Sequence, residues 1–113
     1  MMSFELRQLL HKFILHDMAI QSLHRDYKVI ENLKMSNIYI PILDRLLKAI
    51  SNDYYNLKRL LAKNKIRVVK WENVDDYFSD LTDTMAGEDA TLRYAKQALK
   101  TQVEHLLISY MHN

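Results

Sequence analysis

The scarcity of chain-breaking residues constrains the fold of this sequence more than any other feature. The 113 residues contain one glycine, Gly87, and one proline, Pro41. Glycine and proline are the residues that most often mark turns and helix ends. A chain with so few of them is expected to form a small number of long helices joined by short turns. We therefore predict an all-α protein.

Hydrophobic periodicity indicates where these helices lie. Apolar side chains recur at steps of three and four, the spacing of one helix face, in residues 6–30, 43–61 and 92–110. Each stretch is predicted as a long helix. Ser3 is a suitable N-cap for the first, and Pro41 suits the first helical position of the second, where its missing N–H is not needed.

The region between the second and last helices is less regular. Residues 66–71 are expected to form an extended connector, and residues 73–85 a short helix with Asp75 and Asp76 in its first turn. The chain is thus predicted to be a compact, mainly antiparallel helical bundle of three long helices plus one short helix, in a single domain over residues 1–113. Its expected core includes Leu46, Ile50, Leu57, Leu99 and Val103.

Composition excludes several classes of protein. With 49% hydrophobic and 27% charged residues the chain lies in the globular range and should fold. It contains no cysteine, which excludes disulfides, thiolate nucleophiles and cysteine-ligated zinc. Charged residues interrupt the apolar N-terminal stretch, so we expect neither a signal peptide nor a membrane span, and a cytoplasmic location.

Charge is distributed unevenly along the chain. Residues 1–71 hold 13 Lys and Arg against 6 Asp and Glu, a net of +7, whereas residues 72–113 hold 3 against 8, a net of −5. The stretch KNKIRVVKWENVDDYFSD, residues 63–80, changes sign at Trp71. Most of this change is interpreted as cations near a helix C-terminus followed by carboxylates at the starts of the next helices.

Histidines and carboxylates are the side chains that metal or proton chemistry would require. His16 falls on the core stripe of the first helix, and Asp17, His24 and Glu31 form a row at its border. No Glu-x-x-His pair occurs, although di-iron bundles require two such pairs. No serine lies in a nucleophile motif, and there is no glycine-rich phosphate loop. We expect structural roles for these residues, no catalytic or metal site, no cofactor, and a protein that is not an enzyme.

A basic surface is the first candidate contact site. It combines cations and an exposed aromatic residue on the second helix with cations on the following connector: Lys48, Tyr55, Arg59, Lys63, Lys65, Arg67 and Lys70. Such a surface suits nucleic-acid phosphates and a stacked base, or an acidic protein partner. An ordinary solvated face is nevertheless the favoured interpretation of these residues.

An association face is the second candidate. Leu10, Ile14 and Met18 form a second apolar row on the first helix, which widens its stripe in this half. A homodimer formed through residues 4–18 would cover this row. Folding of the short helix over the same row would instead leave a monomer. The leading functional hypothesis is a non-enzymatic interaction or regulatory protein that acts through helix-mediated association, with nucleic-acid binding as the alternative.

Overall fold

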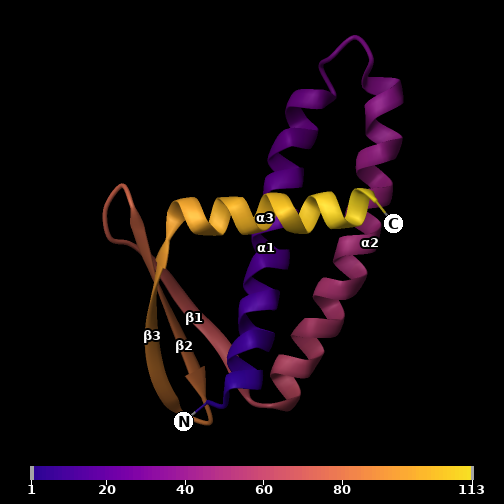
Figure 1. The fold of residues 1–113 in the computed structure, drawn as a ribbon. Helices are drawn as coiled ribbons and strands as arrows, with labels where there is room; N and C mark the ends of the chain where they lie inside the picture. Colours follow the sequence, from indigo (N-terminus) through magenta and orange to yellow (C-terminus); the bar gives the residue numbers. More distant parts are fainter. Residues whose placement is uncertain (1, 113) are drawn as a thin grey trace.

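The computed structural model describes residues 2–112 and shows an α+β fold, with 64% helix and 22% strand. The elements follow one another as α1 (Phe4–Ile30), α2 (Ser36–Lys63), β1 (Ile66–Asn73), β2 (Phe78–Met85), β3 (Glu88–Ala95) and α3 (Lys96–Met111). The strands form an antiparallel sheet in the order β1-β2-β3. Helices α1 and α2 form a long antiparallel hairpin, α3 crosses it about midway, and the sheet lies beside the N-terminal half of α1 (Figure 1).

The predictions of an all-α bundle and of a short helix over residues 73–85 are wrong, because residues 66–95 form the sheet. In β2, Leu81 and Asp83 are buried on the face toward α1, and Thr82 and Thr84 alternate with them on the other face. A period of two is the mark of a strand. The alternation was hidden because a carboxylate, Asp83, occupies a position where an apolar side chain would be expected. The β-branched threonines also favour a strand over a helix.

Two tight turns explain how a sheet forms with so little glycine. Ala86 and Gly87 join β2 to β3 with φ values of 51° and 86°, and a two-residue hairpin turn of this kind needs positive φ at both positions. One glycine is therefore enough. Between β1 and β2, the carboxylate of Asp75 accepts from the backbone N–H groups of Tyr77 and Phe78, at 2.8 and 2.9 Å. Asp75 thus stabilises a turn and not the start of a helix.

The helical hairpin follows the predicted pattern more closely. Ser3 caps α1 as expected, and its hydroxyl accepts from the N–H of Leu6 at 3.2 Å. Helix α2 begins at Ser36, so Pro41 lies inside the helix and not at its first position. The missing N–H removes a single backbone bond close to the helix start.

The first core cluster lies between α1, the end of α2 and the sheet. Leu10 and Ile14 of α1 are 0% and 3% exposed, and they pack with Leu61, Ile66 and Leu81. Met18 packs against the edge of this cluster. The structure therefore places the predicted association face, Leu10, Ile14 and Met18, inside the protomer. Residues near Leu81 do fold over this row, as a strand in place of the expected helix.

The second core cluster joins the three helices and contains Ala19, Leu23, Ile50 and Val103. Of the predicted core residues, Ile50, Leu99 and Val103 are buried, whereas Leu46 and Leu57 are only partly buried. Across residues 2–112, no helix carries an apolar stretch of the length and hydropathy needed to cross a membrane.

Candidate functional site

The far end of the α1–α2 hairpin carries a group of exposed apolar side chains. We define the hairpin tip as the six exposed large apolar residues between the last turn of α1 and the second turn of α2: Val29, Leu33, Met35, Ile38, Tyr39 and Ile42. Each is at least 42% exposed, and Val29 reaches 64%. This end of the hairpin extends beyond α3 and the sheet (Figure 1). In the part of the chain that the structure describes, no further element covers it.

The tip is exposed because each helix of the hairpin has apolar residues on more than one face. A single partner helix can cover only one of these faces. Near its start, α2 has an apolar row that includes Leu43 and Leu46 and packs into the second core cluster. Ile38 and Ile42 are four residues apart, so they share a neighbouring helix face, and that face remains exposed. Contiguous exposed apolar surface on a small protein often marks a contact site for another molecule.

The structure divides the predicted basic surface into two groups. Lys48, Tyr55, Arg59 and Lys63 are exposed along one face of α2, and Lys65, Arg67 and Lys70 follow in the turn and on β1. Tyr55 is 56% exposed, and its ring contacts that of Tyr54 edge-on, with 5.3 Å between ring centroids. Lys70 pairs with Glu72 at 2.6 Å, and this hydrogen bond raises the pKa of Lys70. The Lys70 charge is therefore partly compensated on its own strand.

Lys65 and Arg67 come together with Lys58 at a second surface, which we call the basic groove. It lies between the end of α2 and the start of the sheet and has a volume of about 590 Å³. Its apolar lining comes from Phe13, Leu61, Ile66 and Val68. Among residues 2–112, no carboxylate side chain lines this groove. Lys58 lies near the end of α2, and the turn that follows α2 places Arg67 at the same groove.

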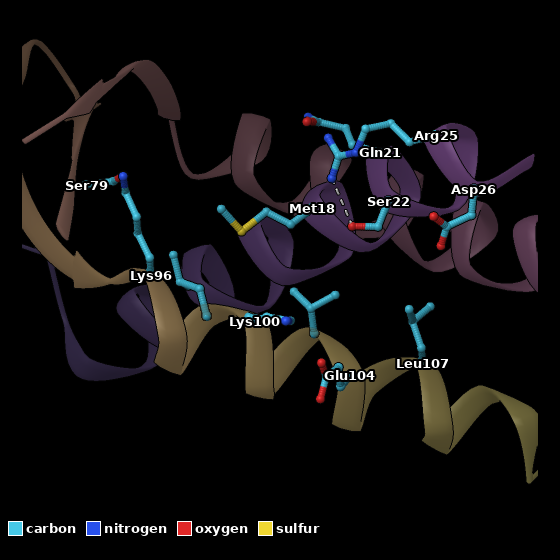
Figure 2. Close-up of a pocket in the computed structure, with 12 residues that line it drawn as sticks. Met18, Gln21, Ser22, Arg25, Asp26, Ser79, Lys96, Lys100, Glu104 and Leu107 are labelled. Carbon is cyan, nitrogen blue, oxygen red and sulfur yellow. Dashed lines mark hydrogen bonds between the residues drawn. The ribbon is translucent and has the colours of Figure 1, made fainter. Parts of the chain in front are cut away.

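A second hollow lies between α1 and α3 (Figure 2) and has a volume of about 580 Å³. Its charged side chains have both signs: Arg25, Asp26, Lys96, Lys100 and Glu104. Arg25 donates to the Ser22 hydroxyl at 3.2 Å. Mixed charges do not select an anion or a cation, so this hollow is best described as a solvated seam between two helices.

His16 connects the three helices through a polar network that extends from the core to the surface. It is 7% exposed, and its Nδ1 donates to the carbonyl oxygen of Lys12 at 2.7 Å. Its Nε2 lies 3.0 Å from the hydroxyl of Tyr110 in α3, and that hydroxyl donates to Asp53 in α2. Burial, with a further contribution from the Asp53 bond, raises the pKa of Tyr110. All three side chains have partners, which supports a structural role for His16.

The predicted row of Asp17, His24 and Glu31 does not assemble into a site. His24 is exposed, and Asp17 accepts a hydrogen bond from Gln21 at 3.0 Å. Within residues 2–112, no three His, Cys, Asp or Glu side chains are grouped so that they would hold a metal ion.

A buried ion pair was missed by the sequence analysis. Asp83 of β2 is 1% exposed, and its Oδ2 accepts from Arg7 of α1 at 2.9 Å. Its Oδ1 is buried and has no hydrogen-bond partner among residues 2–112. The pair joins the sheet to α1. It could be predicted only after β2 had been recognised as a strand, because only then does Asp83 point inward.

Comparison with known proteins identifies a family for this sequence. No curated protein and no solved structure matches the chain. A protein-family model does match over residues 1–113, and its description is YhjD protein.

Proposed function

The chain belongs to the YhjD protein family, and we propose that it is a non-enzymatic cytoplasmic interaction protein that binds a partner protein through the hairpin tip. The observation that carries the proposal is the exposure of six large apolar side chains at one end of the α1–α2 hairpin. An apolar face formed by two adjacent helices suits a partner that contributes its own apolar helix or groove.

The composition of the tip resembles that of protein interfaces. Exposed charged residues, Lys28, Glu31 and Lys34, lie next to the apolar side chains in the sequence and provide a polar rim. Full burial of a Val, Leu or Ile side chain contributes about 1.5–3 kcal/mol. A few such residues at the centre of a contact can therefore supply most of its binding free energy.

The experiment compares three forms of the tagged chain recovered from its native host. They are the wild type, a tip variant with Val29→Asp and Ile38→Asp, and a control with Ile108→Asp. Ile108 is also apolar and 49% exposed, but it lies on α3 away from the tip. Circular dichroism should show that all three are folded.

Quantitative mass spectrometry of the co-purified proteins gives the result. We expect at least one protein to be retained by the wild type and by the control, and to be lost with the tip variant. The same set of proteins with all three forms would contradict the proposal.

Nucleic-acid binding is the second candidate, and a specific arrangement favours it. Lys48, Tyr55, Arg59 and Lys63 share one exposed face of α2, and the fifteen-residue span from the first to the last corresponds to about 22 Å. Binding to phosphates should weaken steeply as salt is raised, and Arg59→Glu with Lys63→Glu should abolish it. Equal affinity at low and high salt would exclude this candidate.

A further inference from the structure

Strand β3 forms an open edge of the sheet. The strand order is β1-β2-β3, so β3 pairs with β2 on one side only. Figure 1 shows no other element of the described chain along its outer side. An edge strand presents unpaired N–H and C=O groups that can pair with another strand.

The two edges of the sheet differ in regularity. The pairing of β1 with β2 is irregular between Val68 and Lys70, and irregularities and lysines are features that protect an edge. The pairing of β3 with β2 runs without a break from Phe78↔Ala95 to Met85↔Glu88. Strand β3 contains neither proline nor lysine. It therefore lacks these forms of edge protection.

Two residues of opposite charge lie at equal distances on either side of Thr91 in β3. Asp89 precedes Thr91 by two residues and Arg93 follows it by two, so all three lie on one face of the strand. This is the outer face, because Asp80 and Thr82 of β2 pair with Arg93 and Thr91, whereas the buried Leu81 points to the other face.

We propose that two copies of this chain pair antiparallel through β3, with Thr91 opposite Thr91 of the partner subunit, to form one continuous sheet. This register places Asp89 opposite Arg93 of the partner subunit, and the two-fold symmetry repeats the pair. Opposite charges on directly facing residues stabilise a strand pair, and like charges destabilise it. Centring the pair on Asp89 or on Arg93 would place like charges opposite each other, so the charge pattern selects the register centred on Thr91.

Arg93 has a donor free for this contact. Its Nε and Nη2 donate to the two carboxylate oxygens of Asp80, at 2.9 and 3.2 Å. A guanidinium carries five N–H groups, and those on Nη1 are not used by Asp80. The Arg93 side chain is 58% exposed. It can therefore bridge Asp80 of its own chain and Asp89 of the partner subunit.

The inference does not depend on what the hairpin tip binds, because β3 lies in the sheet at the other end of α1 (Figure 1). Variants of the tip should leave the β3 pairing unchanged. Failure of either proposal can therefore be recognised separately.

The first test measures mass by sedimentation over a range of protein concentrations. A monomer has a mass of 13.5 kDa, and we expect the wild type to reach twice that mass. Asp89→Arg alone and Arg93→Glu alone should each raise the dissociation constant about tenfold or more, because each dimer then holds two like-charge pairs. Mixing the two variants should restore the dimer, since every pair in a mixed dimer again joins opposite charges.

The second test uses the absence of native cysteine. Directly opposite Cβ atoms in an antiparallel pair lie about 4.5–5.5 Å apart, within about 1 Å of the ~3.5–4.5 Å between the Cβ atoms of a disulfide. Thr91→Cys should therefore form a symmetric disulfide dimer on mild oxidation, whereas Ala98→Cys, an exposed position on α3, should not. A wild type that stays at 13.5 kDa at all concentrations, or a dimer that is unaffected by Asp89→Arg and not linked through Thr91→Cys, would overturn the proposal.

Discussion

Replacing Arg7 by methionine should destabilise the protein strongly, because it leaves the Asp83 carboxylate buried without its partner. Asp83 is 1% exposed and Arg7 is 29% exposed, with 2.9 Å between Nη1 and Oδ2. Two unit charges about 4 Å apart interact by about 4 kcal/mol at the effective dielectric constant of a protein. Breaking a buried pair typically destabilises a protein by about 3–5 kcal/mol. Because water reaches part of Arg7, we expect a loss of about 3 kcal/mol, at the lower end of this range.

Urea unfolding followed by circular dichroism measures this loss. With a slope of about 1.5 kcal/mol per M, the midpoint should fall by about 2 M. Lys70→Met is the control, because Lys70 bonds Glu72 at 2.6 Å with both side chains exposed, and neither residue lies in β3. Exposed pairs contribute little, so this midpoint should barely move.

A double variant distinguishes stability lost by burying the unpaired Asp83 carboxylate from stability lost with the packing of the Arg7 side chain. Arg7→Met combined with Asp83→Leu should be more stable than Arg7→Met alone, because it no longer buries an unpaired carboxylate. Equal midpoints for Arg7→Met and Lys70→Met would refute the reasoning, and so would a double variant less stable than Arg7→Met.

Three further predictions concern the core and two titrating groups. Leu81→Ala should lower the free energy of unfolding by about 2–5 kcal/mol, because Leu81 is fully buried; Ile108→Ala, at an exposed position, should show little loss in the same urea experiment. The raised pKa of Tyr110 means that the folded state favours the neutral phenol, so this contribution to stability is complete below the unfolded-state pKa of about 10 and is lost as pH rises above it. Unfolding curves at several alkaline pH values should therefore show a smaller loss for Tyr110→Phe than for wild type. The hydrogen bond from Arg93 lowers the pKa of Asp80. The ionised Asp80 carboxylate therefore stabilises the fold above the usual Asp pKa, and this contribution is lost as pH falls through the lowered pKa. Carboxyl NMR titration should show the low Asp80 pKa in wild type and a pKa nearer the ordinary one in Arg93→Gln.

The helical hairpin could be predicted because its signals are local. The apolar repeats over residues 6–30 and 43–61 lie within α1 and α2, and Ser3 caps α1 as expected. A repeat of 3.6 residues and a capping hydroxyl act within one or two turns of chain, so they need no knowledge of distant residues. The predicted start of the second helix at Pro41 was wrong, because α2 already begins at Ser36 and apolar residues continue through the turn before it.

The sheet could not be predicted in the same way. Residues 73–85 fit a helical repeat about as well as a strand alternation, and the inward position of Asp83 weakened the second pattern. Strand pairing is decided by partners elsewhere in the chain. The neighbours of β2 on both sides and the Leu10 surface of α1 stabilise it as a strand, and none of these contacts is visible within its own sequence.

The candidate sites likewise include one surface that the sequence predicted and one that it did not. The basic residues of α2 were predicted to be exposed and are exposed, because their spacing places them opposite the apolar stripe. The hairpin tip was missed. Its signal was the run of apolar residues around the turn in residues 33–42, which was interpreted only as a break between helices.

The sequence by itself determined the helical periodicity of the two hairpin helices, the polarity of their faces and the exclusion of cysteine chemistry, because these depend on residue type and local spacing. The predicted last helix, residues 92–110, begins only at Lys96, because residues 88–95 pair as β3. The tertiary structure alone decided which apolar rows became core and which became surface. Leu10 and Ile14 are buried because the sheet covers them, whereas Ile38 and Ile42 are exposed because neither α3 nor the sheet reaches the end of the hairpin. An apolar row is the same signal in both cases, and its burial depends on whether a distant segment folds over it.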